Sequence, residues 1–226
     1  MRLTSFGKAA ALVLSVAILA ATMAPAFGAA VLAAPQGPER RPVPPRPDAG
    51  MFQILVTGED GPMSDAAVRI WDGRETLDGV TDGRGVCAFS DVRPDVPLTF
   101  RISPRSGGGV RLENIVIPRG MPSSISVQFV ETGVGTDFVV RLGSNPSTGY
   151  SWKIADFGDQ AIVRLEGNFF SDSQTGSRRM AGRGGSDVWV FSTVQRGYAI
   201  LTFEYARSWE RGNYPLRRHF AVVRVR

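Results

Sequence analysis

The sequence predicts an all-β protein built from two β-sandwich domains in tandem. Short runs that alternate apolar and polar residues recur along the chain, as in Phe52-Gln53-Ile54-Leu55-Val56 and Leu98-Thr99-Phe100-Arg101-Ile102. Asp-Gly, Pro and Gly clusters separate these runs at the spacing that is typical of sandwich strands. No long segment keeps apolar residues three and four positions apart, so the pattern favours strands over helices throughout.

The first 34 residues have the composition of a secretory signal peptide. Arg2 and Lys8 precede an apolar run, Ala9–Met23, and the small residues Ala24-Pro25-Ala26 follow it. A basic head, an apolar stretch shorter than a membrane-spanning helix and small residues near a cleavage point are typical of such a signal. We therefore expect an exported protein, periplasmic or secreted, with no stable membrane insertion after cleavage.

Residues 35–49 are rich in proline and arginine and predict an extended linker, because this composition cannot form a core. Residues 50–130 are expected to form the first sandwich. Here Val68-Ile70, Val86-Ala88 and Ile125-Val127-Phe129 continue the alternation of apolar positions. Residues 131–226 are expected to form the second sandwich, with residues 131–135 as the connection between the two.

A turn sequence in the first unit carries a family resemblance. The run Thr81-Asp82-Gly83-Arg84-Gly85, which follows Pro62, Ala66 and Val68, resembles the carboxypeptidase-regulatory-like sandwich modules. The resemblance covers residues 50–130. Modules of that family serve as accessory or adhesive domains, so the resemblance implies no catalytic activity for this unit.

The charge of the chain does not predict a nucleic-acid partner. Lys and Arg together number 26 and Asp and Glu number 21, which gives a formal net charge of +5. The arginines are scattered singly along strand-like segments, without a dense basic run or an RNA-binding signature. A solvated, arginine-biased surface is the interpretation that this pattern favours.

Catalytic groups are scarce. Cys87 is the only cysteine and His219 the only histidine, so no intramolecular disulfide is possible. The two residues fall in different predicted domains, and no neighbouring group is evident to orient the imidazole for a Cys–His pair. We expect Cys87 to be a small core residue and His219 to be exposed or packed near a sheet edge. The sequence thus predicts no catalytic residue and no enzyme.

Four aspartates of the first unit raise the question of a metal ion. Their spacing matches no calcium-binding loop, and turns explain them better. No metal site and no cofactor are therefore predicted. These residues are Asp72, Asp78, Asp82 and Asp91.

Strand patterns continue in the second unit, where Phe138, Val140 and Leu142 alternate with Val139 and Arg141. In later segments, including Phe220–Val225, the alternation is blurred. Blurred alternation is expected where a strand is covered on both faces.

A loop between two of these strands has unusual chemistry: Asn145-Pro146-Ser147-Thr148-Gly149-Tyr150. Asn145 can bond its own turn, Pro146 fixes φ, and Gly149 allows a positive φ. A pre-organised loop loses little conformational entropy on binding. Taken alone, the loop fits a tight turn without a partner as well as it fits a binding loop.

Two further segments favour binding. In Gly182-Arg183-Gly184-Gly185, absent side chains let another chain approach the backbone closely. Arg207-Ser208-Trp209 follows a strand and carries residue types that dominate interface energies, although Trp209 alone also fits a packed edge residue. In an immunoglobulin-like sandwich, loops of this kind lie together at one end.

These three motifs, in this order, resemble the chagasin family of cysteine-protease inhibitors, whose loops read N-P-T-T-G-F/Y, G-x-G-G and R-P-W/F. The resemblance covers residues 133–226 and implies an immunoglobulin-like domain. It also implies reversible, non-covalent inhibition of a papain-like cysteine protease. Ser147 and Thr148 would lie nearest the catalytic cysteine, the glycine loop along the non-primed side, and Arg207 and Trp209 on the primed side. Ser147 and Ser208 stand where the family pattern has threonine and proline.

The predicted function is therefore inhibition of a papain-family protease by a monomeric, exported protein. Two alternatives stay open: a non-inhibitory adhesion or scaffold protein of two sandwich modules, and an enzyme that uses Cys87 or His219. The predicted protease-binding residues are Asn145, Pro146, Ser147, Thr148, Gly149, Tyr150, Gly182, Arg183, Gly184, Gly185, Arg207, Ser208 and Trp209.

Overall fold

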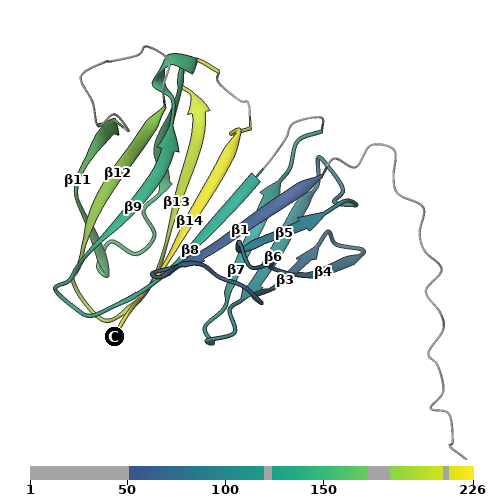
Figure 1. Cartoon of the computed structure of the whole chain (residues 1–226), viewed down its shortest axis with the longest axis horizontal. Coiled ribbons are helices and arrows are strands. Elements are labelled where there is room, and N and C mark those ends of the chain that lie inside the picture. The colour runs from purple at the N-terminus through teal and green to yellow at the C-terminus, as the bar shows by residue number, and fades with distance from the viewer. Residues whose placement is uncertain (1–50, 120–123, 173–183, 211–213) are drawn as a thin grey trace, which may run out of the picture. The chain divides into compact units, whose positions relative to one another are not determined.

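The computed structural model describes residues 51–119, 124–172, 184–210 and 214–226. These residues form strands β1–β14 and one short 3₁₀ turn, η1, which confirms the predicted all-β class (Figure 1). All of them lie within one compact unit, Pro44–Arg226. The predicted signal peptide and linker, residues 1–34 and 35–49, lie outside the described residues. No helix among the described residues has the length and apolar character needed to cross a bilayer.

The strands fall into two groups along the chain. The first group is β1 (Phe52–Gly58), β2 (Gly61–Pro62), β3 (Ala67–Trp71), β4 (Thr76–Val80), β5 (Val86–Phe89), β6 (Pro97–Ser103), β7 (Val110–Val116) and β8 (Ser124–Thr132). The second group is β9 (Asp137–Ser144), η1 (Pro146–Thr148), β10 (Tyr150–Asp156), β11 (Val163–Asp172), β12 (Gly185–Thr193), β13 (Gly197–Arg207) and β14 (Arg217–Val225).

Three sheets organise these strands. One sheet has the order β4-β3-β6-β7 and another the order β11-β12-β9. The third, seven-stranded sheet has the order β10-β13-β14-β8-β1-β2, with β5 also paired to β1. Two hydrophobic clusters form the cores, one built from the first strand group with part of β14 and one built largely from the second group. The two predicted sandwiches are therefore present, and they share a sheet.

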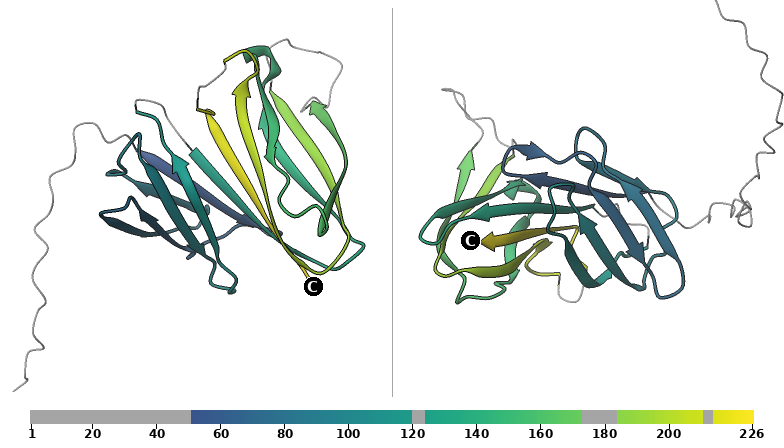
Figure 2. Two further views of the ribbon diagram at one scale, coloured as in Figure 1. Left: turned by 180° about the vertical axis from the view of Figure 1, so that it is seen from behind. Right: turned by 90° about the horizontal axis from the view of Figure 1, so that it is seen from below.

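Strand β8 carries this sharing. It pairs in parallel with β1 on one side and with β14 on the other, as Figures 1 and 2 show. The predicted boundary between residues 130 and 131 falls inside β8, and the connection to β9 is limited to residues 133–136. Backbone hydrogen bonds thus continue from one sandwich into the other.

Strand β14 explains the blurred apolar pattern near the C-terminus. Phe220 and Val222 join the first core, whereas Ala221, Val223 and Val225 join the second. Successive side chains of a strand point to opposite faces, so β14 is covered on both. The expectation of a strand buried on two sides is confirmed.

In β5 the buried positions are Cys87 and Phe89, as expected for Cys87, whereas Ala88, one of the apolar positions in the sequence pattern, is exposed. The reason is the antiparallel pairing with β1, which sets Cys87 opposite the buried Ile54. Residues directly opposite in a sheet share a face, so the strong alternation of β1 fixes that of β5.

Candidate functional site

The loop between β9 and β10 is a single 3₁₀ turn held by its own side chains. Gly149 takes the left-handed conformation, with φ 78°, and donates from its backbone N–H to the Pro146 carbonyl at 3.0 Å. The Ser147 hydroxyl donates to Asn145 Oδ1, and the Thr148 hydroxyl donates to the Asn145 carbonyl, both at 2.7 Å. The expectations for Pro146 and Gly149 are confirmed, whereas the Asn145 side chain makes no cap bond to the backbone of the turn and accepts from the Ser147 hydroxyl instead.

A residue from outside the loop fixes its base. The backbone N–H of Asn145 donates to the hydroxyl of Tyr205, on β13, at 3.1 Å. The Tyr205 ring is buried and stacks on Tyr150, with centroids 5.4 Å apart. Because Tyr150 and Tyr205 belong to paired strands, the sheet sets the angle at which the loop leaves the sandwich.

Trp209 lies against the first loop. A Cβ atom placed on Gly149 would stand 2.3 Å from Cη2 of Trp209, so the indole occupies the space that a side chain would need. The ring remains 64% exposed. Gly149 is therefore required twice, for its positive φ and for the close approach of Trp209.

Arg207 joins the same cluster. Its guanidinium carbon lies 4.5 Å from the centroid of the Tyr150 ring and 5.9 Å from that of Trp209. Nη1 of Arg207 donates to Glu210 at 2.9 Å, and the Glu210 N–H donates to the Arg207 carbonyl. This closed turn restricts the segment that contains Ser208, which stands in the place of a proline.

The glycine motif reaches the cluster from the other sheet. Gly182 and Arg183 lie outside the described residues, while Gly184 and Gly185 lead into β12. A Cβ atom on Gly184 would stand 2.9 Å from the Ser144 carbonyl oxygen. Gly185 pairs with Ser144 in register. The described ends of all three motifs thus meet around residues 144–150.

Two residues of this cluster were missed as site residues from the sequence. Tyr205 was not singled out as a site residue, although its hydroxyl anchors the loop. Glu210 escaped notice although it stands three positions after Arg207, a spacing that suits a local ion pair. Exposed aromatics on the edge strand β11, Phe169 and Phe170, lie near the start of the glycine motif in sequence.

Cys87 and His219 do not have the environments of catalytic groups. Cys87 is buried in the first core, as predicted, and burial raises the pKa of its thiol. The expectation for His219 is wrong: β14 lies inside the shared sheet, and only 5% of His219 is exposed. Its Nδ1 contacts the Ser126 hydroxyl at 2.8 Å, and desolvation lowers its pKa to about 4.

Of the four aspartates expected in turns, Asp72 and Asp82 hold backbone groups of turns, whereas Asp78 lies within β4 and pairs with Arg69. Asp72 Oδ1 accepts the N–H groups of Arg74 and Glu75, and Asp82 Oδ1 accepts those of Arg84 and Val86. The Val86 and Arg84 bonds lower the pKa of Asp82. Within the described ranges, no group of three His, Cys, Asp or Glu residues is arranged to hold a metal ion.

A family of known proteins matches the part of the chain that carries this site. Residues 131–223 match the family model described as Chagasin family peptidase inhibitor I42. The match covers the second sandwich, including the three motifs, and leaves the first strand group outside. A search among curated proteins finds no match.

Several solved structures resemble part of the chain. The cysteine protease inhibitor EhICP2 from Entamoeba histolytica is 23% identical, with a TM-score of 0.37, over 47% of this chain and 100% of its own. Amebosin is 19% identical, with a TM-score of 0.36, over 46% and 99%. PbICP-C, solved in complex with falcipain-2, is 14% identical, with a TM-score of 0.29, over 47% and 91%.

The matched family consists of peptidase inhibitors and not of enzymes, in agreement with the expectation from the missing catalytic groups. The carboxypeptidase-regulatory-like resemblance of residues 50–130 stays a prediction. Residues 131–223 of this chain thus match the chagasin family of peptidase inhibitors, as their three loop motifs predict.

Proposed function

We propose that the cluster around residues 144–150 blocks the active-site cleft of a papain-like cysteine protease, reversibly and without a covalent bond. The observation that carries this proposal is the meeting of the three motifs at one end of the second sandwich. Trp209 packs on Gly149, and Gly184 approaches Ser144. One narrow loop flanked by two others has the form needed to fill a cleft and contact both of its walls.

The first loop is the proposed plug. Its hydrogen bonds to Asn145 and Tyr205 are made before any partner arrives, so little loop entropy remains to be lost on binding. Both hydroxyl protons, of Ser147 and of Thr148, are used inside the loop. The exposed oxygens keep lone pairs, so the loop offers acceptors to a protease. Cys87, the only thiol of the chain, is buried in the first core, so this surface offers no thiol for a disulfide with the catalytic cysteine.

Trp209 and Arg207 are the proposed anchors beside the plug. The Trp209 indole is 64% exposed, and one part of the ring packs on Gly149. It therefore offers a positioned apolar surface to a protease. The Arg207 guanidinium packs on the Tyr150 ring and pairs with Glu210. These two contacts fix its position, so its other N–H groups are oriented before a protease binds. The glycine motif would add backbone contacts on the opposite side of the plug.

We further propose that the protein acts as a monomer outside the cytoplasm. The basic and apolar composition of residues 1–34 supports export. Cys87 is the only cysteine and is buried, so it is not exposed to form a disulfide between two copies. Either a protease of the same cell envelope or one from another organism would meet the inhibitor there.

Inhibition kinetics test the proposal. The purified protein should inhibit papain competitively with a small peptide substrate, so that the apparent Ki rises linearly with substrate concentration. Inhibition should be lost on dilution, the inhibitor should be recovered uncleaved, and a serine protease such as trypsin should keep its activity. Papain that stays fully active at micromolar inhibitor would overturn the proposal in favour of an adhesion or scaffold protein.

A further inference from the structure

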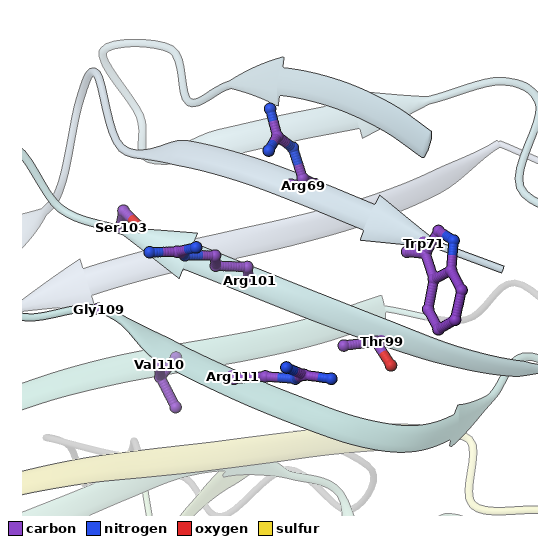
Figure 3. A pocket seen from close by; sticks show the side chains of 8 residues that line it. All are labelled: Arg69, Trp71, Thr99, Arg101, Ser103, Gly109, Val110 and Arg111. Atoms are coloured by element: carbon purple, nitrogen blue, oxygen red, sulfur yellow. The ribbon is translucent and has the colours of Figure 1, made fainter. Parts of the chain in front are cut away.

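Three arginines form a row across the first sandwich. Arg69 on β3 stands directly opposite Arg101 on β6, and Arg101 stands opposite Arg111 on β7. All three are exposed on the outer face of the sheet β4-β3-β6-β7 (Figure 3). Neighbouring strands are separated by about 4.8 Å, so the row extends roughly 10 Å. In the sequence these residues looked like single, scattered arginines.

The centre of the row differs from its ends. Arg69 is bound by Asp78 on β4 at 2.6 Å, and Arg111 by Glu113 at 2.7 Å. Arg101, between them, makes no ion pair with the described residues. Like charges directly opposite in a sheet are destabilising. A local arrangement that weakens the fold without a compensating contact is most often found at functional sites.

An aromatic platform lies beside the row. Trp71 follows Arg69 by two residues on β3, so both side chains are on the same face, and the indole is 48% exposed. Thr99 stands opposite Trp71. Trp71, Thr99 and Ser103 line an open depression of about 460 Å³ (Figure 3). The three arginines, Arg69, Arg101 and Arg111, line the same depression. A second depression, of about 490 Å³, adjoins it and shares Arg69, Arg101 and Ser103.

We propose that this face, which we name the arginine row (Arg69, Arg101, Arg111 with Trp71 and Thr99), binds an acidic polysaccharide. Guanidinium groups bind carboxylate and sulfate oxygens in a bidentate manner. Arg101 offers such a group without an ion pair among the described residues, whereas Arg69 and Arg111 would exchange Asp78 and Glu113 for anionic groups of the ligand. The flat indole offers an apolar surface for a sugar ring, and the small hydroxyls of Thr99 and Ser103 suit sugar hydroxyls. The indole and the two hydroxyls beside the guanidinium groups are the features that suit an acidic glycan, and an acidic peptide or a nucleic acid is tested as the alternative occupant.

Binding of defined polymers to the whole protein tests this proposal without any protease. The probes, at physiological salt, are polygalacturonate, which carries carboxylates, heparin, which carries sulfates, and the neutral polymer dextran. Polyglutamate and single-stranded DNA serve as acidic polymers of other classes. Arg101→Gln and Trp71→Ala remove the two central features. Arg84→Gln is the matched control, because Arg84 is an arginine of the same unit, 86% exposed, in a turn away from the row. Thermal melting checks that each variant is folded.

At least one of the two acidic polymers should bind, and the better one identifies the acidic group. Arg101→Gln and Trp71→Ala should each weaken binding by about 10-fold or more, Arg84→Gln should change it by less than about 2-fold, and dextran should not bind. An equal loss in Arg84→Gln would mean binding through net charge alone. That result, equal affinity for polyglutamate or single-stranded DNA, an unaffected Trp71→Ala, or no binding of either polymer would overturn the proposal.

Discussion

The indole ring of Trp209 lies on the bare backbone of Gly149, so that a Cβ atom on Gly149 would stand 2.3 Å from Cη2 of the ring. The contact joins two loops that are about 60 residues apart in the sequence. Any side chain at position 149 would therefore displace the indole ring. The proposed inhibitory surface depends on this pair, and four variants probe its surroundings.

Gly149→Ala should weaken inhibition and destabilise the fold. The left-handed conformation at φ 78° costs a residue with a Cβ about 1–2 kcal/mol, and the added methyl must displace Trp209. Gly135→Ala is the matched control, because Gly135 has φ 76° and open space around its Cβ position. Chemical denaturation should give both variants similar losses of stability. Only Gly149→Ala should raise the Ki for papain; an equal rise in Gly135→Ala would contradict the role of the Trp209 contact.

Tyr205→Phe should loosen the base of the first loop. The change removes the hydroxyl that accepts the Asn145 N–H and keeps the ring that packs in the core. Loss of one such bond costs about 1 kcal/mol of stability, and the freed loop should raise the Ki several-fold. Tyr198→Phe, near the start of β13, serves as the control and should leave the Ki unchanged. A Tyr205→Phe variant with an unaltered Ki would show that the anchor is irrelevant to inhibition.

Ser208→Pro should strengthen inhibition. Proline restricts the unbound turn, and a compatible site gains about 0.4–1 kcal/mol from the lost freedom, which is about a 2- to 5-fold lower Ki. The ion pair between Arg207 and Glu210 already holds part of this turn, so the gain should lie toward the lower end. The Ki is measured by titration of papain. A higher Ki in Ser208→Pro would mean that the backbone conformation of the turn is incompatible with proline.

Stability should fall on acidification through His219. Burial lowers its pKa to about 4 from 6.5, so between these values the unfolded chain binds a proton that the folded chain does not. The free energy of unfolding therefore rises with pH across this window, and the part lost at its acid end is on the order of 3 kcal/mol. Denaturation at pH 4.5 and 6.5 should show a smaller pH difference in His219→Gln than in the original protein. An identical difference would show that carboxylates alone set the acid sensitivity.

Local patterns predicted much of this molecule. The alternation in β1 and β6 identified both strands and their buried faces, because one face of each lies on a core and the other is solvated. The fixed conformation of the Asn145–Tyr150 loop followed from the restricted φ of Pro146 and the permissive Gly149. These features depend on residues close together in the chain.

Features that depend on strand order were not predictable in this way. Parallel pairing of β8 with both β1 and β14 joins distant segments, and nothing local to Ser124–Thr132 signals it. The burial of His219 follows from the interior position of β14 in the shared sheet. Likewise Arg69, Arg101 and Arg111 become neighbours only through the pairing of β3, β6 and β7.

Titration of papain with the whole protein and with Trp209→Ala measures the proposed surface most directly. A central, desolvated indole contributes about 2 kcal/mol or more, so Trp209→Ala should raise the Ki by about 30-fold or more while thermal stability stays the same. Phe157→Ala, an exposed aromatic beyond the far end of β10, is the control and should leave the Ki unchanged. A Ki that Trp209→Ala leaves unaltered, or no inhibition by the original protein, would contradict a protease-binding site at Gly149 and Trp209.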